Sequence, residues 1–84
     1  MDAVTERVIQ VIAKAQHIPV ETVKAESTFE ELKIDSLDGL QIVFALEEEF
    51  DISIPDEEAK ALRSIEQAVA GIRQLLAAKA SATA

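Results

Sequence analysis

The stretch that decides the fold is residues 35–50, which read DSLDGLQIVFALEEEF. Asp35 is a favourable N-cap for a helix, and Asp38 follows three residues later, where an acid suits the positive end of the helix dipole. The segment ends at Phe50, before a short extended link at residues 51–55. We therefore predict a helix that begins at Asp35 and Ser36 and ends near Phe50.

This helix carries more apolar surface than a small core requires. On a helical wheel its apolar residues spread over roughly 220°, about twice the stripe that a helix facing one side of a bundle needs. Its solvated face comprises Asp38, Gln41, Ala45, Glu48 and Glu49. Leu37 and Phe44 lie at one edge beside the acids, so we expect them to be exposed, and contact with a partner explains them as well as burial does.

Two further main helices follow from apolar residues at three- and four-residue steps. The first runs from about Asp2 to Gln16, with a stripe of Val4, Val8, Val11, Ile12 and Ala15. The last begins at Ser64, where Gln67 completes an S-x-x-Q capping box, and its stripe is Ile65, Ala68, Val69, Ile72 and Leu75 or Leu76. Residues 77–84 form a small-residue tail that we expect to be frayed.

The remaining segments are a short helix and a long connection. Pro55 suits the first position of a brief helix through Ala59. Residues 17–34 form a connection that we expect to pack through Val20, Val23, Phe29, Leu32 and Ile34. The sequence thus predicts a single all-α domain over residues 1–84: a small four-helix bundle with three main helices, a short third helix, and a long loop between helices 1 and 2.

Composition excludes several classes of function. The 84 residues include no cysteine, and therefore no disulfide, thiolate metal site or cysteine nucleophile. A net charge of −8 and the absence of Trp and Tyr argue against nucleic-acid binding. The longest uncharged apolar stretch, residues 42–46, is too short to span a bilayer. The first residues lack a basic stretch followed by an apolar one, so we expect no export signal. We expect an acidic, monomeric, cytoplasmic protein with basic protein partners.

The negative charge is concentrated in one part of the chain. Residues 35–58 contain nine acids and no Lys or Arg, whereas the rest of the chain has seven acids and eight basic residues. A charge run is commonly only a solvated face, but the lack of counter-charge costs self-repulsion. A docking surface for basic partners explains the run better.

The residues required for catalysis are scarce. The single histidine, His17, follows the first helix and has no motif around it. There is no nucleophile elbow, phosphate-binding loop or zinc motif, and the acids around Pro55 do not fit an EF-hand. Ser36 stands out because a helix N-terminus tolerates an attached phosphate, although a helix cap explains the same residue. We expect no enzyme activity.

Two longer runs point to a family. Residues 29–38 read FEELKIDSLD, and residues 45–59 read ALEEEFDISIPDEEA. With their spacing they resemble the acyl carrier proteins, over about Val4 to Leu76. The resemblance implies that Ser36, beside Asp35, carries 4′-phosphopantetheine transferred from coenzyme A by a phosphopantetheinyl transferase. The chain would then be a non-catalytic carrier of acyl thioesters in fatty acid, polyketide or specialised lipid biosynthesis.

The resemblance also implies a docking helix for acyl-loading and acyl-processing enzymes, whose contact residues are Leu37, Asp38, Leu40, Gln41, Phe44, Glu47 and Glu48. Hydrophobic cargo is expected to fold back between the helices. The chain departs from the family pattern at Lys33, where Gly is usual, and at Gly39, Gln41, Phe44 and Gly71. A dedicated carrier for a specialised cargo is therefore a serious alternative to the housekeeping one.

A second class of function stays open at the level of sequence. An acidic helical adaptor would bind basic proteins through the same helix and use Ser36 only as its cap. Calcium buffering by the acidic surface is a weaker third hypothesis.

Overall fold

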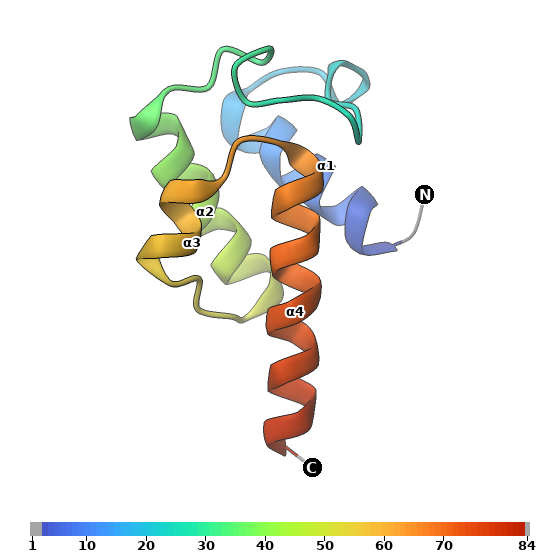
Figure 1. Cartoon of the computed structure of the whole chain (residues 1–84). Helices are drawn as coiled ribbons and strands as arrows, with labels where there is room; N and C mark the ends of the chain where they lie inside the picture. The colour runs from blue at the N-terminus through green and yellow to red at the C-terminus, as the bar shows by residue number, and fades with distance from the viewer. Residues whose placement is uncertain (1–2, 84) are drawn as a thin grey trace.

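Four α-helices make up the chain in the computed structural model, which describes residues 3–83 and the side chains through residue 80 (Figure 1). The elements are α1 (Ala3–Gln16), the 3-10 helix η1 (Val20–Thr22), α2 (Ser36–Phe50), α3 (Asp56–Ala61) and α4 (Ile65–Thr83). The predicted all-α bundle with a short third helix is confirmed. Asp2, which the prediction included in the first helix, and Ala84 lie outside the described residues.

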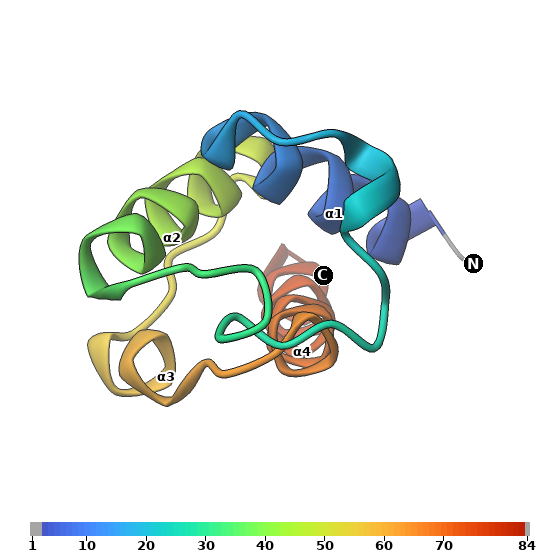
Figure 2. The ribbon, with the colours of Figure 1, turned by 90° about the horizontal axis from the view of Figure 1, so that it is seen from above.

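The core lies where α1, α2 and α4 meet. Viewed along α4, α1 and α2 lie on one side, and α3 lies next to the start of α4 (Figure 2). Residues 17–34 cross the same N-terminal start of α4. The fully buried side chains of α1 and α4 come from the predicted stripes, and α2 adds two more; together they are Val8, Ile12, Ile42, Leu46, Ile65 and Ile72. Ile9 and Ala13 of α1 are also buried, although the predicted stripe omitted them.

The helix ends differ from the prediction in three places. Pro55 is the N-cap of α3 rather than its first residue. At α4 the Ser64 hydroxyl accepts from the Gln67 N–H (3.2 Å), but the Gln67 side chain accepts from Arg63 N (2.6 Å), one residue earlier than in a capping box. Helix α4 continues through Thr83 instead of ending near Leu76, because residues 77–83 are rich in alanine, the best helix former.

The long connection is ordered by its own hydrogen bonds. Backbone bonds from Phe29 N to Arg63 O (2.8 Å) and from Ile65 N to Ser27 O (3.0 Å) pair it with the link before α4. Within it, the Glu31 carboxylate accepts from the N–H and the hydroxyl of Thr28, both at 3.0 Å.

Its apolar residues pack largely as predicted. Val23 and Phe29 are buried, and Leu32 and Ile34 are packed against the core. The prediction was wrong for Val20, which is 43% exposed, because Val23 fills the core position at the end of η1.

Among residues 3–83, three residues other than glycine adopt the left-handed conformation: His17, Lys33 and Asp51, with φ between 53° and 58°. Each follows a helical turn and closes it with a backbone hydrogen bond just beyond, such as Ile34 N to Phe29 O (2.9 Å). A side chain in this conformation costs roughly 1–2 kcal/mol relative to glycine. Lys33 therefore bears a conformational cost just before Ser36.

Two ion pairs join the end of α2 to the other long helices. The Arg7 guanidinium of α1 donates to the Glu49 carboxylate (2.6 Å) and carbonyl (3.0 Å), and lies 4.5 Å from the centre of the Phe50 ring. The Lys79 ammonium of α4 donates to the carboxylate and the carbonyl of Asp51, both at 2.8 Å. Both contacts close the bundle at the end opposite Ser36.

The Lys79 contact predicts a pH-dependent contribution to stability. Hydrogen bonding and charge from Lys79 lower the pKa of Asp51 below its ordinary 3.8. The folded state then gains stability above pH 3.8, and this gain is lost as the pH falls through the lowered pKa. Lys79→Met should lower the free energy of unfolding at neutral pH, and the difference from wild type should shrink in strong acid.

Denaturant unfolding at neutral pH and in strong acid measures the difference in stability, and an NMR titration measures the pKa of Asp51. Lys14→Met, which removes an exposed lysine near the end of α1, is the control and should not move the Asp51 pKa. An unchanged Asp51 titration in Lys79→Met would refute the assignment.

Candidate functional site

Ser36 is the first residue of α2, and it is exposed. The cap of the helix is Asp35, whose carboxylate accepts from the Asp38 N–H at 2.9 Å. The Ser36 hydroxyl makes no hydrogen bond within residues 3–83. The interpretation of Ser36 as a helix cap is therefore wrong, because its neighbour performs that role.

A hollow of about 910 Å³, the outer groove, borders Ser36. One wall comes from the start of α2, with Gly39, Leu40 and Val43, and the opposite wall comes from α3 and the link after it. Two cations, Lys60 and Arg63, line that opposite wall. Sequence reasoning did not identify them as site residues, because they lie 24 and 27 positions from Ser36 and only the fold brings them to the same groove.

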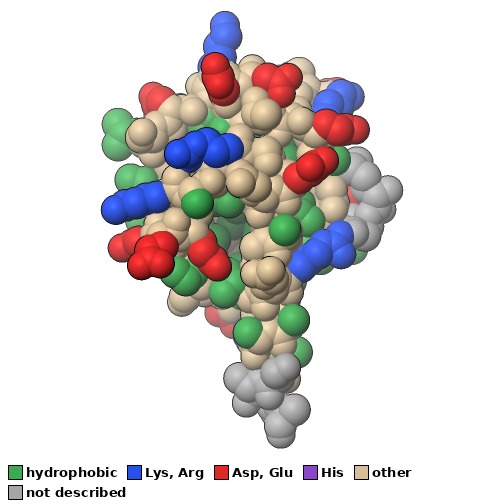
Figure 3. Space-filling model, in the orientation of Figure 1, with side chains coloured by type: hydrophobic (Ala, Val, Ile, Leu, Met, Phe, Trp, Pro, Cys, Tyr) green, Lys and Arg blue, Asp and Glu red, His purple; other side chains and the backbone are tan. Residues whose placement is uncertain are grey.

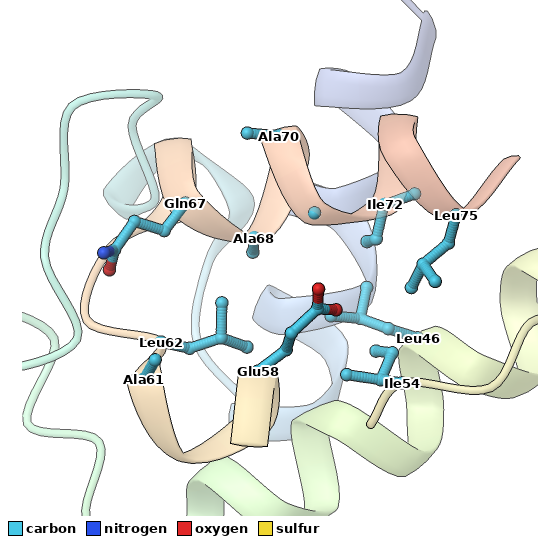
Figure 4. A pocket seen from close by; sticks show the side chains of 11 residues that line it. Leu46, Ile54, Glu58, Ala61, Leu62, Gln67, Ala68, Ala70, Ile72 and Leu75 are labelled. Atoms are coloured by element: carbon cyan, nitrogen blue, oxygen red, sulfur yellow. The ribbon is translucent and has the colours of Figure 1, made fainter. Parts of the chain in front are cut away.

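A second hollow of about 250 Å³, the inner pocket, lies between α2, α3 and α4. Figure 4 shows Leu46, Ile54 and Leu62 facing Ala68, Ile72 and Leu75 of α4, while Glu58 extends from α3 toward α4. Its lining is almost wholly aliphatic. Leu62 lines both the inner pocket and the outer groove, so the two hollows adjoin at this residue.

The outer side of α2 exposes apolar side chains. Leu37, Leu40 and Phe44 are 72%, 51% and 61% exposed, and Gln41 and Glu48 are exposed beside them. The wheel predicted exposure for Leu37 and Phe44 but not for Leu40, which the family resemblance alone supplied. On the face shown in Figure 3, apolar side chains reach the surface at the edge where α2 lies. We call these five residues the α2 surface.

The other two predicted docking residues are half-buried. Asp38 lies within the first turn of α2. The Glu47 carboxylate accepts from the Ile54 N–H at 2.7 Å and so fixes the link between α2 and α3.

The acidic run is partly neutralised in the fold. Its lack of counter-charge in sequence suggested strong self-repulsion, yet Arg7 pairs with Glu49 and Lys79 pairs with Asp51 from distant parts of the chain. Glu48 forms no ion pair or hydrogen bond through its side chain within the described chain. The unpaired negative charge of residues 35–58 is therefore smaller than the sequence count, while Glu48 of the α2 surface keeps its charge available.

Neither a metal cluster nor a membrane span is evident in the part of the chain that the structure describes. No group of three or more His, Cys, Asp or Glu side chains is placed to hold a metal ion in this part. None of the helices over residues 3–83 has the length and hydropathy needed to cross a bilayer. His17 is exposed just after α1, and it lies 19 residues before Ser36 in the sequence.

Residues 6–72 match a family model described as a phosphopantetheine attachment site. The chain is 42% identical over 76 residues to the mitochondrial acyl carrier protein of Dictyostelium discoideum, covering 90% of this chain and 63% of that one. A crystal structure of an acyl carrier protein from Thermotoga maritima superposes with a TM-score of 0.74 at 30% identity, covering 83% of this chain and 82% of that one.

These matches define the class first: a domain built around a phosphopantetheine attachment site. The chain belongs to the acyl carrier protein family. The predicted family, fold and prosthetic group are confirmed. The chain spans 63% of the length of the Dictyostelium relative.

Because Asp35 caps α2 and the Ser36 hydroxyl does not, substitutions at these two neighbouring residues should affect stability to different extents. Asp35→Ala removes the capping carboxylate and should lower the free energy of unfolding by about 1 kcal/mol. Ser36→Ala removes an exposed hydroxyl and should change it by less than about 0.5 kcal/mol. Urea unfolding of the two variants measures both values, and a larger loss in Ser36→Ala than in Asp35→Ala would contradict the assignment of the cap.

Proposed function

We propose that Ser36 is the attachment site of the phosphopantetheine arm, and that the chain carries acyl groups on this arm. The observation that carries the proposal is the free, exposed Ser36 hydroxyl at the rim of the outer groove. When bound, the arm supplies a terminal thiol that holds the acyl group as a thioester, which this cysteine-free chain otherwise lacks.

The residues around Ser36 fit an attached phosphodiester. The first N–H groups of α2 favour negative charge, and Asp35 occupies the Asp38 N–H without contacting the Ser36 hydroxyl. Lys60 and Arg63 supply positive charge on the far wall of the groove. No side chain that the structure describes accepts a hydrogen bond from the Ser36 hydroxyl, so the transferase would activate it.

The inner pocket suits the aliphatic part of the cargo. Its lining of Leu, Ile and Ala side chains favours hydrocarbon over water, at about 0.8 kcal/mol for each methylene group buried. Leu62 lines both this pocket and the outer groove, so the two hollows adjoin at that side chain.

The partners follow from the α2 surface, where apolar side chains lie beside the Glu48 carboxylate. A phosphopantetheinyl transferase and enzymes of fatty acid or related biosynthesis, each with a basic and apolar patch, would dock there. The cytoplasmic location and the monomeric state stay predictions, and the mitochondrial designation belongs to the Dictyostelium relative.

The adaptor hypothesis relied on Ser36 as the cap of α2, and Asp35 fills that role. The outer groove beside Ser36 also has no purpose in a plain adaptor. Nothing in the structure favours the adaptor over the carrier.

Modification at Ser36 is tested by intact-mass measurement. The purified chain, incubated with coenzyme A and a broad-specificity transferase, should gain the mass of one phosphopantetheine. Ser36→Ala should gain none, whereas Ser27→Ala, which removes another serine of the same loop region, should be modified as wild type. An unmodified wild-type chain, with the transferase active on a second carrier, would refute the proposal.

Docking through the α2 surface is tested by matched pairs of variants. Glu48→Lys should weaken binding to the transferase by about three- to tenfold, and the effect should shrink at high salt, because an exposed charge pair is screened. Glu21→Lys makes the same charge change at the exposed η1 and should have little effect.

The apolar component has its own control. Phe44→Ala should weaken binding by about tenfold, because an exposed aromatic anchor contributes more than 1 kcal/mol at many interfaces. Val20→Ala, at an exposed apolar residue outside α2, should bind as wild type. Equal losses in the α2 variants and their controls would contradict the assignment.

A further inference from the structure

The chain contains only two glycines, and each lies inside a helix on the wall of a hollow. Gly39 of α2 lines the outer groove, and Gly71 of α4 lines the inner pocket. Glycine weakens a helix interior relative to alanine, so each position calls for a physical reason.

Backbone geometry supplies no such reason at Gly71. No glycine in the described chain has a positive φ, so Gly71 adopts a backbone that any residue accepts. A Cβ atom built at Gly71 would meet no atom within 4 Å, so close packing does not exclude a side chain either. The physical consequence of glycine here is empty space.

That empty space belongs to the inner pocket. Gly71 shares a face of α4 with Ala68, three residues before it, and Leu75, four residues after it, and both line the pocket with it. At about 250 Å³ the pocket is smaller than most ligand sites, which span about 300–1,000 Å³. One added side chain on this wall would therefore remove a large share of its volume.

We propose that Gly71 determines the length of acyl chain that this carrier shelters, an inference that rests on the proposed function. Glycine leaves the pocket open along α4 toward Leu75, and so admits a longer straight aliphatic chain than any larger residue would. A bulky side chain at position 71 would fill the space that the end of the cargo needs. Gly71 is thus a specificity-determining residue that partners do not need to touch.

The test uses the full chain, modified at Ser36 with a series of straight-chain acyl groups of increasing length and verified by mass. The rate at which hydroxylamine cleaves the thioester reports how far the acyl chain is held in the pocket, because a bound chain restrains the thioester against attack. In the wild type, cleavage should slow with each added methylene until the pocket is full. Each methylene excluded from the pocket should raise the cleavage rate by roughly fourfold.

The variants form a graded series. The quantity compared is the acyl-chain length beyond which cleavage no longer slows. Gly71→Ala should shift this length slightly toward shorter chains, Gly71→Leu should shift it further, and Gly71→Phe should shift it furthest. Ala77→Phe places the same ring on an exposed part of α4 outside the pocket and should follow the wild-type profile. Circular dichroism confirms folding of each variant, and Gly71→Leu decides the matter if Gly71→Phe does not fold.

The outcomes separate the two proposals. Identical length profiles in wild type and Gly71→Leu, or the same shift in Ala77→Phe, would overturn the role of Gly71 while leaving Ser36 as the attachment site. A chain that gains no mass at Ser36 would overturn the proposed function and this inference with it.

Discussion

The backbone pairing of the long loop with the link before α4 is the contact on which the rest of the site depends. Two hydrogen bonds, Phe29 N to Arg63 O and Ile65 N to Ser27 O, join segments that are 34 and 38 residues apart. These bonds hold the loop across the N-terminal start of α4, and α3 lies opposite the start of α2. Both walls of the outer groove, and the position of Ser36 at its rim, follow from this pairing.

Helix caps and buried stripes could be predicted from the sequence, because they depend on residues that are close together along the chain. The Asp35 cap, the Ser64 hydroxyl at α4 and the buried stripe of α4 are all decided within one or two helical turns. The length of α4 was also readable in principle, since alanine favours the helix, but small residues at a chain end suggested fraying instead. Ser36 was recognised through family resemblance, because a lone serine beside a cap carries little information.

Long-range contacts were beyond the sequence. Arg7 and Glu49 are 42 residues apart and Lys79 and Asp51 are 28 apart, so counting charges along the chain overstated the free acidity at the end of α2. Three further features likewise depend on how the helices pack: the exposure of Val20, the two cations Lys60 and Arg63 on the groove wall, and the position of Leu62 between the two hollows. In each case the residue type was visible, but its neighbours were not.

The short helix α3 has a consequence for how the molecule responds to its contents. It has six residues, no buried side chain and no side-chain cap, and a helix this short is not stable by itself. It nevertheless forms a wall of both hollows. None of the buried core side chains comes from α3, so a shift of this helix would leave the packing among α1, α2 and α4 in place. Under the proposed function, one presented surface can then serve cargoes of different bulk.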